Sequence, residues 1–258
     1  MKEKANNWEQ YKFVIRELVT RDFKRKYRRS FLGVIWSVLN PLLTMAAMAL
    51  IFTQILGRDI PNFPVFIFTG LLTVQLFNGA TSSSLSTLVD NKNMLIKIKF
   101  PMEILVLSRV CTAIVDFVFA GVAYIVILAV YRIPPSIYML FYPVIFICLI
   151  LFTLGFSFAL SVAYSYFGDL KHIWSVLTSM LMWLSGVFWT IDRLSGWPER
   201  IVRANPMFNF INASRQVIMW QQLPSFNQIL QMVVWGLGAF IIGMRIFKKN
   251  KVKILTKI

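Results

Sequence analysis

Residues 21–57 read RDFKRKYRRSFLGVIWSVLNPLLTMAAMALIFTQILG and join two stretches that cannot share one environment. The first ten residues contain six Lys and Arg, whereas the stretch from Phe31 to Gly57 contains no charged residue. A charged side chain near the centre of a bilayer costs about 2.5–3.5 kcal/mol on insertion scales. We therefore predict a membrane–water boundary at Ser30–Phe31, with the basic side in the cytoplasm.

The composition extends this conclusion to the whole chain. Of its 258 residues, 57% are hydrophobic, and the mean hydropathy is +0.65. A soluble domain of this length does not carry so much apolar surface. Several windows approach or exceed the ~20 apolar residues that cross a bilayer as a helix. We predict an all-α, polytopic membrane protein.

The hydrophobic windows predict six transmembrane helices and three regions. An arm at 1–30 precedes a six-span domain at 31–247, and a basic tail at 248–258 follows it. A basic loop at 89–103 follows the second span, and the connection at 191–227 is expected to dip into the outer face as a re-entrant hairpin. The six spans are predicted at about 31–56, 65–88, 104–131, 138–164, 173–190 and 228–246.

The distribution of positive charge orients the predicted spans. Of the 27 Lys and Arg residues, twenty fall in segments that this topology places inside and six in segments that it places outside. This bias predicts that both termini are cytoplasmic. The formal charge of +16 is then explained by membrane orientation and anionic lipid, and we predict no nucleic-acid partner.

The arm contains a candidate amphipathic helix at residues 8–20. On a helical wheel one face collects its apolar side chains, and such a helix lies in the membrane interface. These are Trp8, Tyr11, Val14, Ile15, Leu18 and Val19. The stripe breaks at Asp22, Arg25 and Lys26, so we expect the helix to become solvated, or to bend, before the first span. Two roles remain open: anchoring to lipid headgroups, and contact with a partner or a substrate headgroup.

The sequence contains no motif for ATP hydrolysis or metal chemistry. None of the 12 glycines is followed by lysine, which excludes a GxxxxGK[ST] phosphate loop. Beyond the arm, the acids predicted to be cytoplasmic are only Asp90, Glu103 and Asp169, and they are scattered. A lipid transferase would need clustered acids to hold a divalent metal. We predict no catalytic residue, no metal and no cofactor on this chain.

Two charged residues fall inside the third predicted span. Asp116 and Arg109 are seven residues apart, about 10 Å along a helix, which is too far for a direct pair. An acid inside a membrane is a candidate functional residue. The alternative is a polar bond between Asp116 and a neighbouring helix.

Aromatic residues gather near the ends of the predicted spans. One explanation is the belt of aromatic residues that many membrane proteins place at the membrane surface. The other is a conduit in which sugar rings stack on aromatic faces. The candidates for that conduit are Phe66, Phe68, Phe188, Trp189, Phe208 and Phe210.

Three motifs resemble one transporter family. RDFKRKYRRSFLGVIWSVLNPLL at 21–43 is similar to that family's pattern of a basic arm, Leu-Gly, Trp and Asn-Pro. NKNMLIKIKFPMEIL at 91–105 resembles its loop after the second span, and NPMFNFINASRQVI at 205–218 resembles the segment before its last span. The family is the membrane subunit of type-two ABC exporters of bacterial polysaccharides, which carry O-antigen, capsule or teichoic acid.

This resemblance implies a function and a set of partners. The chain would form a homodimer in the bacterial cytoplasmic membrane and bind two copies of a separate cytoplasmic ATPase, which uses ATP and Mg. It would export a glycan or teichoic acid linked to a lipid of the undecaprenyl diphosphate type.

The resemblance also implies roles by position. The segment that couples transport to the ATPase would comprise Asp90, Asn91, Lys92, Asn93, Met94, Leu95, Ile96 and Lys97. Leu32 and Gly33 would form the loop at the cytoplasmic gate, and the freedom of the glycine backbone suits a turn there. Four cations would stand at the headgroup level and attract the lipid diphosphate. They are Arg25, Lys26, Arg28 and Arg29.

Other functions remain possible on the sequence alone. An ABC exporter subunit for a drug or a lipid would share most of these features. An ion-coupled secondary transporter would depend on Asp116. A membrane-bound glycolipid enzyme is disfavoured by the scattered acids.

Overall fold

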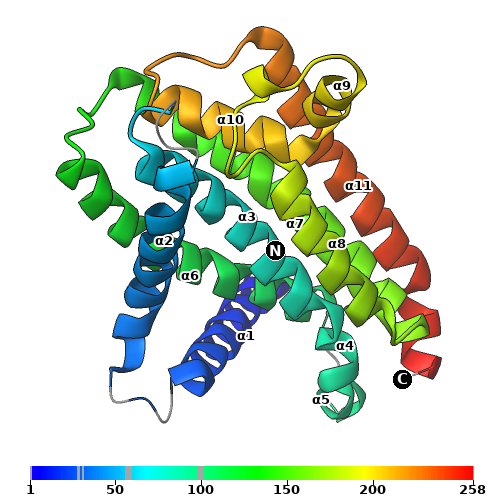
Figure 1. Cartoon of the computed structure of the whole chain (residues 1–258). Coiled ribbons are helices and arrows are strands. Elements are labelled where there is room, and N and C mark those ends of the chain that lie inside the picture. Colours follow the sequence, from blue (N-terminus) through cyan, green and yellow to red (C-terminus); the bar gives the residue numbers. More distant parts are fainter. Residues whose placement is uncertain (1, 28–29, 31, 56–59, 98–100, 258) are drawn as a thin grey trace.

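The computed structural model describes residues 2–27, 30, 32–55, 60–97 and 101–257, and helices dominate these residues without any strand among them (Figure 1). In chain order they are α1 (Lys2–Tyr27), η1 (Gly33–Ile35), α2 (Trp36–Ile55), α3 (Phe63–Leu85), α4 (Thr87–Asp90), α5 (Lys92–Lys97), α6 (Glu103–Val130), η2 (Ile137–Phe141), α7 (Tyr142–Tyr166), α8 (Leu170–Leu184), η3 (Ile191–Arg193), α9 (Trp197–Ala204), α10 (Pro206–Ile218) and α11 (Phe226–Lys257).

Four helices in the described part of the chain are long and apolar enough to cross a membrane. They are α3, α6, the continuous stretch Ile137–Tyr166, and Phe226–Lys251 of α11. The all-helical membrane class is therefore confirmed. The first and fifth predicted spans correspond to α2 and α8, and α8 has only 15 residues, or about 22 Å at 1.5 Å per residue. The count of six spans stays a prediction.

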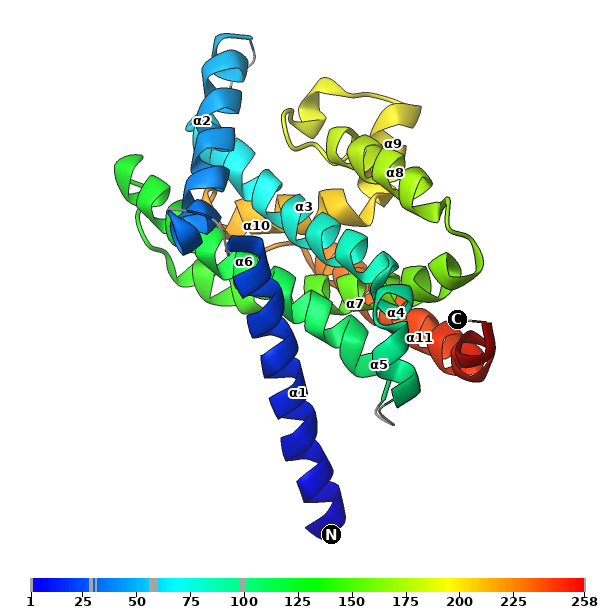
Figure 2. The ribbon, with the colours of Figure 1, turned by 90° about the horizontal axis from the view of Figure 1, so that it is seen from below.

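α1 agrees with its prediction in part. The helix continues to Tyr27, and Lys24, Arg25 and Lys26 are exposed whereas Asp22 and Phe23 are partly buried. It continues because the residues that break the apolar stripe face a partner helix: Asp22 and Lys26 form ion pairs with α6. Seen from below, α1 crosses α6, and its N-terminal half extends beyond the rest of the bundle (Figure 2).

The helices bury two apolar cores. The larger is centred on α3, whose side chains from Val65 to Gly70 are all buried, and includes residues of α6, α7 and α10. The smaller core joins residues of five helices: Leu18, Leu88, Met102, Phe158, Phe247 and Ile254 are among them. It lies toward the end of the molecule where α1, α4, α5 and the C-terminus gather, opposite α9 and α10 (Figure 1).

α7 and α11 pack backbone against backbone. A methyl group added to Gly243 would overlap the main chain of Gly155, and one added to Gly155 would overlap the main chain of Ala239. Glycine permits such a close approach because it has no side chain, and small residues serve the same purpose between membrane helices in general.

Helices occupy both C-terminal segments, and those in the first agree with the short helices expected there. The connection at 191–227 contains η3, α9 and α10, and Asn205 caps α10 by accepting a hydrogen bond from the Met207 amide at 2.9 Å. The expected tail at 248–258 continues α11 to Lys257. There Lys251 bonds Glu103 at 3.0 Å, and Ile254 is fully buried.

Candidate functional site

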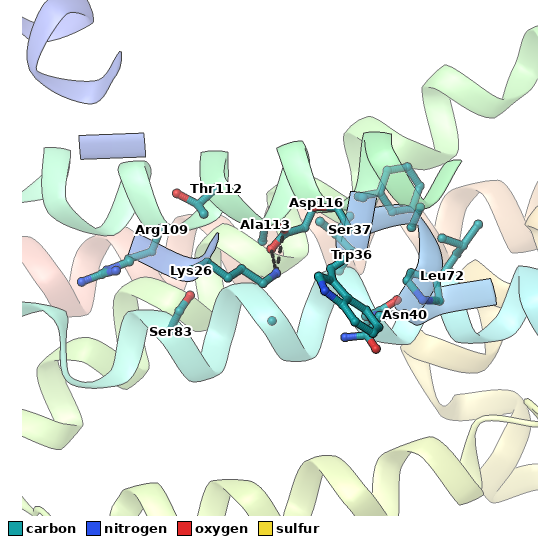
Figure 3. A pocket seen from close by; sticks show the side chains of 16 residues that line it. Lys26, Trp36, Ser37, Asn40, Leu72, Ser83, Arg109, Thr112, Ala113 and Asp116 are labelled. Atoms are coloured by element: carbon teal, nitrogen blue, oxygen red, sulfur yellow. Dashed lines mark hydrogen bonds and ion pairs between the residues drawn. The ribbon is translucent and has the colours of Figure 1, made fainter. Parts of the chain in front are cut away.

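A cavity with a mixed lining of charged, polar and apolar side chains lies where α1, α2, α3 and α6 meet. Its volume is about 260 Å³, and Figure 3 shows charged and amide side chains around it. α1 contributes Lys26, while α6 contributes Arg109 and Asp116. The uncharged lining includes Trp36, Ser37, Asn40, Gln75, Ser83 and Thr112.

An ion pair crosses this cavity from α1 to α6. The ammonium of Lys26 donates to both carboxylate oxygens of Asp116, each at 3.0 Å. The Lys26 side chain is 50% exposed and that of Asp116 is 35% exposed. Of the two interpretations of Asp116, a polar bond to a neighbouring helix is the one that this geometry supports.

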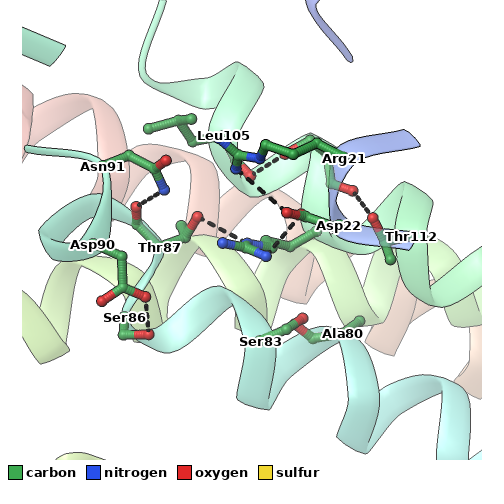
Figure 4. Close-up of polar contacts among 12 residues, drawn as sticks. Arg21, Asp22, Ala80, Ser83, Ser86, Thr87, Asp90, Asn91, Leu105 and Thr112 are labelled. Atoms are coloured by element: carbon green, nitrogen blue, oxygen red, sulfur yellow. Dashed lines mark hydrogen bonds and ion pairs between the residues drawn. The ribbon is translucent and has the colours of Figure 1, made fainter. Parts of the chain in front are cut away.

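A second ion pair runs between the same helices with its charges exchanged. Arg109 on α6 donates to Asp22 on α1 at 2.7 Å, and it donates to the hydroxyl of Thr87 at 3.2 Å. This pair is more enclosed, with side chains 20% and 10% exposed. Asp22 also pairs with its neighbour Arg21 at 3.3 Å, as Figure 4 shows, and the rings of Phe23 and Phe119 stack at 5.4 Å. α1 is thus held by two reciprocal charge pairs.

Arg109 separates the cavity from a second pocket. That pocket has a volume of about 470 Å³ and is lined by Arg21, Arg25, Asp90, Asn91 and Arg109. Three arginines from two helices therefore face the segment that follows α3. The predicted headgroup cations fall into both spaces, Arg25 in the outer pocket and Lys26 in the inner cavity.

The predicted gate residues form a turn between α1 and α2. Gly33 has φ +51°, in the left-handed region that favours glycine. Its amide donates to the Ser30 hydroxyl at 3.2 Å, and the Ile35 amide donates to the carbonyl of Leu32 at 3.0 Å. The turn that the sequence predicted at Gly33 is therefore present. Arg28 and Arg29 lie outside the described residues.

The predicted coupling segment begins with the last residue of α4, Asp90, and continues through Asn91 into the short helix α5. Lys92 and Asn93 are exposed, while Met94 and Leu95 pack against the smaller core. Asp90 accepts a hydrogen bond from Ser86 at 2.7 Å, and Asn91 donates to the carbonyl of Thr87 at 2.8 Å. The backbone of Ile96 and Lys97 belongs to α5, and their side chains lie outside the described set.

The aromatic residues proposed for a conduit are mostly core residues instead. Phe66, Phe188, Phe208 and Phe210 are at most 4% exposed, so they pack the subunit interior because large apolar rings gain most from burial. The structure corrects the conduit prediction for these four. Trp189 is half-buried, and its indole donates to the carbonyl of Trp183 at 3.0 Å.

Phe68 is buried as well, but it lies at the edge of a third cavity. That cavity has a volume of about 250 Å³ between α2, α3 and α8, and it also contains Thr44, Gln75, Asn78 and Met182. The buried amide oxygen of Asn78 has no hydrogen-bond partner. Gln75 lines both this cavity and the one that contains Lys26.

Sequence reasoning missed the role of Arg215, which it treated as one of the outside charges. Its side chain is 2% exposed and donates to the carbonyls of Phe66, Gly186 and Val187 at 2.8–3.3 Å. Its guanidinium carbon also lies 3.3 Å from the centroid of the Phe66 ring. Only the apolar neighbours of Arg215 in PMFNFINASRQVI could have signalled burial.

It also missed Asp22 as a partner of α6. The signal was present in the sequence, because an arginine inside a hydrophobic span needs an acid. The arm contains a choice of acids, however, and the sequence does not indicate which of them meets Arg109.

Comparison with known proteins identifies similar chains. Residues 14–219 match the family model described as ABC-2 type transporter. The chain is 28% identical over 244 residues to the O-antigen export system permease protein RfbA of Myxococcus xanthus, covering 94% of each chain. It is 29% identical to the RfbA protein of Klebsiella pneumoniae, covering 91% of this chain and 90% of that protein.

More distant similarity extends to capsule export. The chain is 18% identical to the polysialic acid transport protein KpsM of Escherichia coli, covering 97% of this chain and 98% of that one. These alignments cover 91–97% of this chain, and the family match at 14–219 includes the cavity residues and α10.

Proposed function

Because this chain belongs to the ABC-2 type transporter family, we propose that it is the membrane subunit of an ATP-driven exporter of bacterial polysaccharide. The observation that carries the proposal is the near full-length similarity to permeases named for O-antigen export and for polysialic acid transport. ATP hydrolysis would take place in a separate subunit, since this sequence has no phosphate loop.

The assembly we propose contains two copies of this chain and two copies of a cytoplasmic ATPase. Each copy would cross the membrane six times with both termini inside, α2 and α8 completing the count, and the 191–227 segment would form a re-entrant hairpin. α8 supports a second copy because it exposes a wide apolar face in the isolated subunit, which includes Val176, Leu177, Met180, Trp183 and Leu184.

The coupling segment would transmit force from the ATPase to the membrane helices. α4 and α5 lie at the end of the molecule that carries α1 and the C-terminus (Figure 1). Thr87 on α4 accepts a hydrogen bond from Arg109, and Arg109 pairs with Asp22 on α1. A push on α4 would thus reach both α6 and α1 through one side chain.

The substrate we propose is a glycan on a lipid diphosphate. Its phosphates need cations at the level of the headgroups, and Arg21, Arg25, Lys26 and Arg109 line two pockets that share Arg109. A drug or lipid exporter remains the second candidate within the family. An ion-coupled transporter is less well supported, because Asp116 already pairs with Lys26.

Reconstitution with the partner ATPase tests this function. A tagged chain purified in mild detergent should retain an ATPase at one copy per copy of this chain. In proteoliposomes the complex should move a lipid-linked polysaccharide when ATP is added. A preparation that transports the polysaccharide without any ATPase would contradict the proposal, as would a complex that hydrolyses ATP and moves only drugs or phospholipids.

A further inference from the structure

We propose that the cavity between α1, α2, α3 and α6 binds the phosphate-bearing headgroup of a lipid, and that Asp116 occupies Lys26 until this headgroup displaces it. The inference rests on the proposed function, since the lipid diphosphate of an exported glycan is such a headgroup. It adds a site within one subunit and an internal carboxylate that competes with the ligand.

The cavity has the chemistry of a phosphate site. Lys26 and Arg109 face it with positive charge, and Asn40, Gln75 and Ser83 add polar groups that can donate hydrogen bonds. Bonds from ammonium and guanidinium groups to phosphate are about twice as strong as neutral ones. Trp36 adds a flat aromatic surface beside them (Figure 3).

The size of the cavity fits a headgroup and excludes a long glycan. Sites for small molecules have volumes of roughly 300–1,000 Å³, and this cavity, at about 260 Å³, lies just below that range. A diphosphate with the start of its sugar would fill it, while the rest of the chain would extend outside.

The two ion pairs of α1 differ in how readily a phosphate can replace the carboxylate. Arg109 and Asp22 are at most 20% exposed, and Thr87 holds the arginine further, so this pair forms a fixed wall. Lys26 and Asp116 are 50% and 35% exposed. A pair so accessible to water contributes little stability, so a phosphate with greater charge can replace Asp116 on Lys26.

The outer pocket provides a route to this site. Arg21 and Arg25 line it, and Arg109 lines both the pocket and the cavity. Asp90 also lines the outer pocket, so an anionic headgroup that enters there meets three arginines and one acid before it reaches Lys26. Release of Asp116 would then remove one link between the last turn of α1 and α6, while the Asp22–Arg109 pair remains.

The inference is tested by two variants that should change the dissociation constant for the lipid diphosphate in opposite directions. The full-length protein in phosphatidylcholine nanodiscs is titrated with undecaprenyl diphosphate, and fluorescence is followed with Trp36→Phe as the blank. Asp116→Asn removes the competing carboxylate, so the dissociation constant should fall about two- to fivefold. Lys26→Gln removes the cation, so the dissociation constant should rise about tenfold or more.

A purely structural ion pair predicts a different result. Both variants break the same pair, so both would then change binding in the same direction, and that outcome would overturn the proposal. Asp116→Ser repeats the measurement if Asp116→Asn does not fold. Lys24→Gln is the matched control, because Lys24 is an exposed cation on the same helix that does not line the cavity.

Further arms identify the source of the phosphate and separate this inference from the proposed function. Undecaprenol, which has no phosphate, should not bind. If phosphatidylglycerol nanodiscs abolish binding of the diphosphate in a way that depends on Lys26, the natural ligand is a phospholipid; if they do not, it is the lipid-linked substrate. Glycan export without the opposite responses would refute the site alone, whereas opposite responses without export would refute the exporter alone.

Discussion

At the scale of single residues, Arg215 shows how a charge can be buried without an acid. Three main-chain carbonyls from two separate segments accept its hydrogen bonds, and the ring of Phe66 lies beneath the guanidinium. A planar fork of donors can reach all of these at once, whereas an ammonium cannot. Arg215 thereby fastens α10 to α3 and to the segment after α8.

We predict that Arg215→Met strongly destabilises the protein. The change removes the side-chain donor from the buried carbonyls of Gly186 and Val187, which lie outside any helix, at a cost of about 1–3 kcal/mol each. Thermal unfolding in detergent, followed by size-exclusion chromatography, should show a large loss, and Arg215→Lys should recover only part of it. Arg203→Met is the control, because Arg203 is 61% exposed in its pair with Glu199 and should change little. Equal stability of the Arg215 and Arg203 variants would contradict this view of α10.

The sequence predicted part of the candidate site at this scale. Asp116 and Arg109 stood out because charges inside an apolar span need partners, and Lys26 stood out within the basic arm. The pairing itself could not be predicted, since it depends on where α1 crosses α6. Arg215 was missed because a cation between two predicted helices resembles a solvated loop residue.

At the scale of elements, the reciprocal ion pairs decide how α1 lies on α6. Each helix contributes one acid and one base, so only one register of α1 satisfies both pairs. We predict that Asp22→Arg lowers the melting temperature sharply, since breaking an enclosed pair costs roughly 3–5 kcal/mol. The double variant Asp22→Arg with Arg109→Asp should restore most of that loss.

The exposed Glu9–Lys12 pair on the same helix provides the control for this charge exchange. Its side chains are 74% and 56% exposed, so reversing both charges should change the free energy of unfolding by less than about 1 kcal/mol and leave the melting temperature close to that of the parent. Failure of the Asp22–Arg109 double variant to recover, with normal expression, would show that this pair does not set the register.

The contact between α7 and α11 yields a prediction that compares two glycines on one helix. Gly243→Ala should destabilise the protein, because the new methyl group meets the main chain of Gly155. Gly238→Ala on the same helix should be neutral or stabilising by up to about 1 kcal/mol, because it has open space and alanine favours the helix. Thermal unfolding of the two variants side by side provides the measurement, and a smaller loss for Gly243→Ala than for Gly238→Ala would contradict it.

The sequence predicted the helices best where length and apolar composition are enough to identify a membrane span. The spans at 65–88, 104–131, 138–164 and 228–246 all correspond to helices of membrane length. α1 extends further than predicted because its polar residues find partners on α6, which periodicity within one helix cannot reveal. α8 ends at Leu184, where the chain turns. The carbonyls of Gly186 and Val187, which follow, accept hydrogen bonds from Arg215.

At the scale of the whole molecule, the basic segments gather at one end and α9 and α10 at the other (Figure 1). We predict that replacing residues 92–97 with a Gly/Ser linker uncouples ATP hydrolysis from transport in the reconstituted complex. The helix that would receive the push from the ATPase is then absent. A linker of equal length in place of residues 131–136, at the opposite end, should leave hydrolysis stimulated by substrate. Stimulated hydrolysis that survives the change at 92–97 would show that the coupling assignment is wrong.

The smaller core has a consequence for how the protein is made. Leu18 of α1 and Ile254 of α11 belong to the same apolar cluster. The surface that α1 packs against is therefore incomplete until the last turns of α11 have left the ribosome. α1 is synthesised before α2 to α11, yet it is among the last of these helices to be secured. During synthesis the apolar face of α1 must therefore be shielded from water in another way. The membrane surface, to which an amphipathic helix binds reversibly, can provide this.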